Sequence, residues 1–333
     1  MSPIATPSLP RSRGPLSHAL ISTIAGEAPH AQTFPVPHPV IADPLGADAQ
    51  LALYICYELH YHGFSGVDDG WEWDPGLLAF RHELEDQFLA TLRGQTSGAN
   101  DATAALDRLA VEPQQGSGLS DYLSERGTWV QMREFFAHRS LYHLKEGDPH
   151  AWVIPRLSGA AKAALVAVEF DEYGGGRVER MHSTLFANLL REAGMSSRYL
   201  AYLDCVPPES LATVNFMSLC GLHRNLRAAL VGLFAATEIT TAPSARRIVA
   251  GLTRLGAPRA CRHFYTEHIE ADAVHEQILR HDIVAQMIQD DPKCEGDIVF
   301  GIEASELLEQ RLARFVLDKW NRELSSLMPV AGG

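Results

Sequence analysis

The stretch GLLAFRHELEDQFLATLR, residues 76–93, decides the fold class. Its large apolar residues recur every three or four positions and fall mostly on one stripe of a helix, with acidic residues opposite. Asp74 and Pro75 precede the stretch, and this pair favours a helix start, because aspartate caps free amides and proline needs no amide partner there. The stretch is therefore predicted to be an amphipathic helix.

Similar patterns extend along the chain on both sides of this helix. Helix is favoured over residues 51–64, 119–144, 158–173, 177–194, 221–240, 244–256, about 259–289 and about 301–327. Alternating strand patterns between turn dipeptides are essentially absent, so the predicted fold class is all-α. The first 44 residues hold nine of the 19 prolines. Because proline fixes φ and lacks an amide donor, residues 1–45 are predicted to be an extended or disordered arm.

Composition excludes several classes of function. The chain has 333 residues, and 28 Lys+Arg against 41 Asp+Glu give a net charge of −13 without a basic run, which argues against nucleic-acid binding. No run of apolar residues is long enough for a membrane span. Five scattered cysteines form no CxxC pair, which is typical of reduced thiols. The N-terminus lacks the pattern of a secretory signal, so we expect a cytoplasmic protein.

The segment EHIEADAVHEQ, residues 267–277, carries the strongest chemical signal. His268, Asp272 and His275 stand at i, i+4 and i+7, so on a helix they fall within about 40° of one another. Two imidazoles and one carboxylate are a donor set that suits iron. The alternative is a solvated helix face, since Glu267 and Glu276 belong to the same segment.

Two further segments supply possible ligands. Glu238 interrupts an apolar helix, where a carboxylate is costly unless it is paired or binds a metal; otherwise it reaches solvent where Pro243 soon stops the helix. His182 follows two candidate partners, Glu179 three residues before it and Glu172 ten residues before it. The three glycines at 174–176 weaken a helix, and an unwound turn there could re-aim Glu172.

Glu172, His182, Glu238 and the His268, Asp272, His275 triplet resemble the ligand set of the haem-oxygenase-like diiron oxidases, a family of iron-containing redox enzymes. The order of the ligands and the 30-residue separation of Glu238 from His268 carry the resemblance, which covers roughly residues 155–290. For the first ligand we favour Glu172 over Glu179, because DEYGGG is similar to the family's own segment.

The resemblance implies a haem-oxygenase-like helical bundle that binds two Fe(II) ions and uses O2 as co-substrate. It implies one domain over residues 46–330, with extra N-terminal helices at 46–150 and the metal-binding core at 151–330. One iron would bind Glu172 and His182 and the other His268 and His275, with Glu238 bridging and Asp272 as a further ligand. By proximity in sequence, we expect the substrate pocket to include Tyr173, Phe186, Phe234 and Thr237.

The resemblance favours a small aliphatic substrate, above all an amino acid or related amine, undergoing N-oxygenation, desaturation or oxidative C–C cleavage. It leaves room for an external electron donor and a homodimer. Oxidative decarboxylation of a fatty acid is the competing reaction, and a metal-free hydrolase or binding protein of the same architecture is a second alternative. A ferritin-like bundle using Glu179 with His182 and Asp272 with His275 is a third. Glu58, His60 and His62 resemble a ligand cluster, but alternate residues of a helix face different ways, which favours a structural role.

Overall fold

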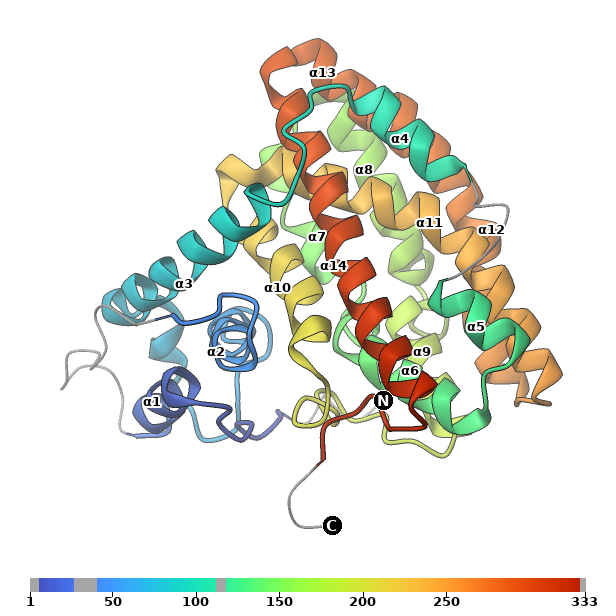
Figure 1. Cartoon of the computed structure of the whole chain (residues 1–333). Coiled ribbons are helices and arrows are strands. Elements are labelled where there is room, and N and C mark those ends of the chain that lie inside the picture. Colours follow the sequence, from blue (N-terminus) through green and yellow to red (C-terminus); the bar gives the residue numbers. More distant parts are fainter. Residues whose placement is uncertain (1–5, 27–40, 112–117, 330–333) are drawn as a thin grey trace.

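The computed structural model describes residues 6–26, 41–111 and 118–329, and it confirms the predicted all-α class (Figure 1). The described residues form α-helices with short 3₁₀ and π segments and no β-strand. The α-helices are α1 (Pro15–Ile24), α2 (Ala47–Glu58), α3 (Pro75–Arg93), α4 (Ala102–Ala110), α5 (Leu119–Glu125), α6 (Trp129–His143), α7 (Asp148–Ala151), α8 (Gly159–Glu172), α9 (His182–Glu192), α10 (Pro208–Leu222), α11 (Arg227–Arg254), α12 (Arg259–Gln277), α13 (Ala285–Asp290) and α14 (Glu295–Asn321). A π-helical segment, Ile278–Val284, joins α12 to α13.

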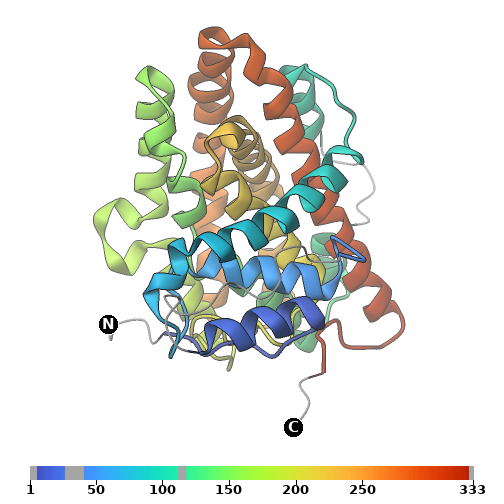
Figure 2. The same cartoon turned by 90° about the vertical axis from the view of Figure 1, so that its left-hand side faces the viewer.

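Helix α11 is the centre of the bundle and packs against α14, α12 and α5 (Figures 1 and 2). Two glycines set its crossing with α14. A Cβ atom at Gly232 would overlap the carbonyl of Ile298, and one at Gly301 would overlap the carbonyl of Ala229. The backbones of α11 and α14 therefore approach more closely at this crossing than any other residue pair would allow.

The prediction that a helix ends near Pro243 is wrong. Helix α11 continues through Pro243 to Arg254 without interruption. An interior proline costs about 3 kcal/mol, because it removes one hydrogen bond and crowds the preceding turn. The helix buries residues along its whole length, and this packing offsets the local cost.

The predicted arm at residues 1–45 also needs correction. Residues 1–5 and 27–40 lie outside the described residues, but Pro15–Ile24 form helix α1, with Leu20 and Ile24 fully buried. Asp48, on α2, accepts hydrogen bonds from the backbone amides of Leu16 and Ser17 at 2.9 and 2.8 Å. This carboxylate therefore caps α1 and fixes it to α2, a tertiary contact that proline content does not reveal.

The remaining differences concern helix boundaries. The stretch between the predicted helices 76–93 and 119–144 contains the short helix α4, and α14 begins and ends about six residues before the predicted 301–327. Among the described helices, none combines the length and the apolar character that crossing a lipid bilayer requires.

Candidate metal centre

A left-handed glycine turn brings Glu172 and His182 together. Helix α8 ends at Glu172, and Gly174, Gly175 and Gly176 then have φ values of 68°, 62° and 76°, which favour glycine. After a 3₁₀ turn, His182 begins α9 with its Nδ1 atom 2.8 Å from Glu172 Oε2. Glu179 lies exposed in that 3₁₀ turn. The ten-residue spacing is thus the one that the fold uses, and the ferritin-like alternative loses one of its Glu-x2-His pairs.

Glu238 points into the bundle and meets His275. The Glu238 side chain is buried on α11, and its Oε2 atom lies 2.9 Å from Nδ1 of His275 on α12. Oε1 of Glu172 lies 3.8 Å from the same nitrogen. Glu172, Glu238 and His275 therefore form a buried group whose ligand atoms lie within 4.8 Å of one another.

A second buried group contains a residue that sequence reasoning missed. Glu146, His182 and His268 also offer ligand atoms within 4.8 Å of one another. Glu146 Oε1 lies 3.5 Å from His268 Nε2, and the rings of His182 and His268 are 4.4 Å apart between centroids. His143 Nδ1 contacts the same Glu146 oxygen at 2.8 Å. The available signal was the three-residue spacing of His143 and Glu146, two positions that the predicted core boundary at residue 151 excluded.

The structure groups the predicted ligands differently from the hypothesis. His182 lies with His268 rather than with Glu172 alone, and His275 lies with Glu238. Glu172 contacts histidines of both groups, so it is better placed than Glu238 to link them. Asp272 lies on α12 one turn from His268, but its side chain is outside the described residues.

The charges of these groups depend on one another. Burial alone would raise the pKa of Glu146, but His143 and His268 hold it well below its ordinary value. Burial likewise opposes ionisation of Glu172, whose pKa His182 lowers. Burial would lower the pKa of His268, but the adjacent Glu146 carboxylate raises it to about 9. In the metal-free protein, protonated histidines therefore compensate the negative charge of the buried acids.

The residues present fit a metal. Within the described part of the chain, three buried atoms have no hydrogen-bond partner: Glu146 Oε2, His182 Nδ1 and His268 Nε2. His182 Nδ1 lies close to Glu172, but the geometry of that contact is not that of a hydrogen bond. Buried polar atoms in native proteins are rarely unpaired, so these three indicate a missing partner. Carboxylates and imidazoles together suit iron. Glu169, on the same helix as Glu172, is a further buried acid without a partner in the described structure, and burial raises its pKa to about 9.

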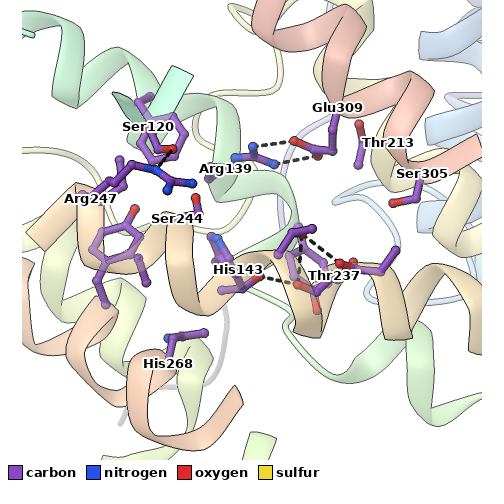
Figure 3. Close-up of a pocket in the computed structure, with 18 of the residues that line it drawn as sticks. Ser120, Arg139, His143, Thr213, Thr237, Ser244, Arg247, His268, Ser305 and Glu309 are labelled. Atoms are coloured by element: carbon purple, nitrogen blue, oxygen red, sulfur yellow. Dashed lines mark hydrogen bonds and ion pairs between the residues drawn. The ribbon is translucent and has the colours of Figure 1, made fainter. Parts of the chain in front are cut away.

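A cavity of about 360 Å³ borders this centre (Figure 3). Its wall includes His143 and His268. Of the four predicted pocket residues, only Thr237 lines it. Tyr173 instead donates a hydrogen bond to Asp148 at 2.8 Å, Phe186 packs on His143 and Phe264, and Phe234 stacks on His150. Proximity in sequence to a ligand therefore did not predict proximity to the cavity, because neighbours on a helix face different ways.

Comparison with known proteins identifies the family of this chain. The iron-containing redox enzyme family matches residues 133–310, more than half of the chain. The chain therefore belongs to this family, and it is an iron-containing oxidoreductase with a haem-oxygenase-like helical fold.

One curated relative is a nitrosourea synthase from Streptomyces achromogenes subsp. streptozoticus, 28% identical over 170 residues. The match covers 50% of this chain and 35% of that protein, so the chain corresponds to about a third of its relative's length. The two buried ligand groups both lie inside the family region.

Proposed function

We propose that this protein is a non-haem diiron enzyme that uses O2 to oxidise a small aliphatic amine or amino acid. The observation that carries the proposal is the pair of buried ligand groups, joined through the contact between Glu172 and His182. One group offers Glu146, His182 and His268, and the other offers Glu172, Glu238 and His275. Two adjacent groups of this kind favour two metal ions rather than one.

Two ferrous ions held in these groups would supply the electrons that reduce O2. The chain's own residues would position and protect that chemistry. His143 orients the Glu146 carboxylate through their 2.8 Å contact. The Nδ1 atom of His268 donates a hydrogen bond to the Phe264 carbonyl at 2.8 Å, which leaves Nε2 facing Glu146 as a ligand atom. All six ligand side chains are buried, so the groups that would hold the metal ions lie inside the bundle.

The cavity beside the centre has a largely apolar wall that also carries charged side chains, and these charges support a small substrate with charged groups. Its lining includes two arginines, two glutamates and several hydroxyl groups, whereas a fatty acid would need a long apolar tunnel. Similarity to a nitrosourea synthase supports N-oxygenation, ahead of desaturation or oxidative C–C cleavage, since a nitrosourea carries an oxygenated nitrogen. Insertion of one oxygen atom and reduction of the other to water consume two electrons beyond those of the substrate, so this reaction needs an external electron donor.

Specific observations weigh against the alternatives. The charged side chains in the cavity argue against a fatty-acid decarboxylase, and a metal-free hydrolase or binding protein would not explain the unpaired buried atoms of Glu146 and His268. We place the enzyme in the cytosol, because all five cysteines are buried free thiols.

Anaerobic titration with Fe(II), followed by measurement of O2 uptake, tests the proposal. The wild type should bind two ferrous ions and consume O2, and His268→Ala should lose at least one ion and most of the O2 uptake. His263→Ala is the matched control, since His263 lies exposed on the same helix and should leave both quantities unchanged. Full iron loading and O2 uptake in His268→Ala would overturn the proposal.

A further inference from the structure

Three of the helices that wall the cavity also lead to a candidate ligand. Helix α6 contributes Arg139 and His143, and the turn after it carries Glu146. Helix α11 contributes Thr237, which precedes Glu238. Helix α12 contributes His268 itself. One end of the cavity therefore opens on the metal centre, and its other lining residues surround whatever molecule reaches that centre.

The side of the cavity formed by α6 and α14 holds a pair of opposite charges. Arg139 donates two hydrogen bonds to Glu309 of α14, at 2.8 Å and 2.6 Å, in the forked geometry of a guanidinium with a carboxylate. The pair is not sealed in the core, because the side chains of Arg139 and Glu309 are 26% and 36% exposed. Figure 3 shows the pair among the residues that line the cavity, with Ser244 and Arg247 on the Arg139 side and Thr213 and Ser305 on the Glu309 side. Burial would raise the pKa of Glu309, but Arg139 holds it below its ordinary value, so both members are charged.

A charge pair of this kind complements a zwitterion. An α-amino acid carries an ammonium and a carboxylate one carbon apart, and these can bind Glu309 and Arg139 respectively. A guanidinium has five N–H donors, of which Glu309 uses two, so Arg139 retains donors for a second carboxylate. Glu306 and Gln310 line the same part of the cavity and add acceptors near the ammonium position.

Resting on the proposed function, we propose that the Arg139–Glu309 pair binds the α-carboxylate and α-ammonium groups of an amino-acid substrate whose side chain extends toward His268. Arg139 and His143 are one turn apart, about 6 Å along α6, and His143 contacts the ligand Glu146 at 2.8 Å, so the charge pair lies on the order of 9 Å from the ligands. Reacting atoms must approach within about 3.5 Å, which leaves on the order of 6 Å for the side chain. That span fits a chain as long as that of lysine, and it is too long for alanine.

Isothermal titration calorimetry on the iron-loaded enzyme, kept anaerobic, tests this inference without using activity. The probes are L-lysine, cadaverine, 6-aminohexanoate, L-alanine and dodecanoate. L-Lysine should bind at least tenfold more tightly than cadaverine, which lacks the carboxylate, and than 6-aminohexanoate, which lacks the α-ammonium. L-Alanine and dodecanoate should bind more weakly still. Equal affinities for lysine and its two truncated analogues in the wild type would overturn the inference without any variant.

Two substitutions separate recognition from a purely structural ion pair. In Arg139→Gln, lysine should fall to the affinity of cadaverine, and in Glu309→Gln to the affinity of 6-aminohexanoate. A structural pair would instead weaken all ligands alike or none. Arg133→Gln is the matched control, since Arg133 lies exposed on the same helix and bonds the Gly194 carbonyl outside the cavity. If iron binds and O2 is consumed but the head groups make no difference, this inference fails and the proposed function stands; if iron does not bind, the function itself fails.

Discussion

Lys145 and Glu146 are neighbours in the chain, but they belong to two buried polar clusters of different chemistry. Lys145 belongs to the first cluster, where its ammonium group lies 3.2 Å from Glu58 and above the ring of Tyr61. Tyr199 donates a second hydrogen bond to the same Glu58 oxygen at 2.9 Å. Glu146, the next residue, belongs to the second cluster, where the described side chains that pair with the acids are histidines.

The difference teaches how to distinguish a structural acid from a ligand. A carboxylate beside a lysine is compensated at every pH at which proteins are stable, and it has no need of a metal. A carboxylate beside imidazoles is compensated only when those rings are protonated, and neutral rings are also metal ligands. The structural interpretation of Glu58 from its sequence agrees with these contacts, although the partner Lys145 lies 87 residues away.

The largest expected effect is on the free energy of unfolding, when the Glu58–Lys145 pair of the first cluster is removed. Glu58→Gln leaves the Lys145 ammonium buried without its counter-charge, so the free energy of unfolding should fall by about 3–5 kcal/mol. Urea unfolding of the metal-free protein measures this. The exposed Glu179→Gln is the control and should change stability by no more than about 0.5 kcal/mol. A loss as small as the control's would mean that the pair with Lys145 does not stabilise the fold.

The second prediction concerns a substitution in the histidine–carboxylate cluster. Glu172→Gln should weaken metal binding by more than the roughly 10- to 100-fold that loss of a supporting residue costs, since Glu172 contacts both ligand groups. Its effect on the metal-free protein should be smaller than that of Glu58→Gln, because the change also relieves repulsion from Glu238. Cobalt titration and urea unfolding give the two quantities. Unchanged cobalt affinity with a large loss of stability would reverse the assignment of the two clusters.

The smallest expected effect concerns His138, a buried histidine that lies outside both ligand groups. His138 is buried between the hydroxyls of Ser210 and Ser326, and burial lowers its pKa to about 3. The unfolded chain, with a pKa near 6.5, then binds more protons than the folded chain, so stability falls as the pH drops below about 6.5. Between pH 6.5 and pH 5 the loss should be about 1.5 kcal/mol.

His138→Gln removes this titration, so its unfolding free energy should vary less with pH over the same interval. Urea unfolding of metal-free wild type and variant at both pH values measures the difference. Parallel curves for the two proteins would show that His138 does not contribute to acid destabilisation.

Sequence predicts this fold well wherever a helix has its own periodic pattern. It fails where distant contacts decide, as at Pro243, where packing along both halves of α11 keeps the helix continuous. The glycines at 174–176 are an intermediate case: their weakness as helix formers predicts a break, but only the left-handed backbone explains how Glu172 meets His182.

The candidate site follows the same division. Glu238 is recognisable in sequence because a charge interrupts an apolar helix, and His268 with His275 because they share one helix face. Glu146 sits in a turn between helices, so no periodicity marks it. The grouping of the six residues depends on how α8, α9, α11 and α12 pack, which spacing along the chain does not contain.

The glycine crossing of α11 and α14 has a consequence for the size of the cavity. From Gly232 to Thr240 and from Gly301 to Glu309 the chain advances eight residues, about 12 Å of helix, and both end points line the cavity. The two helices separate beyond the crossing (Figure 1), so a change in their crossing angle displaces the cavity wall while the crossing point stays in place. A rotation of about 5° at that pivot would move a wall by about 1 Å. Proteins with the same ligands could therefore accept molecules of different bulk without exchanging any residue that touches them.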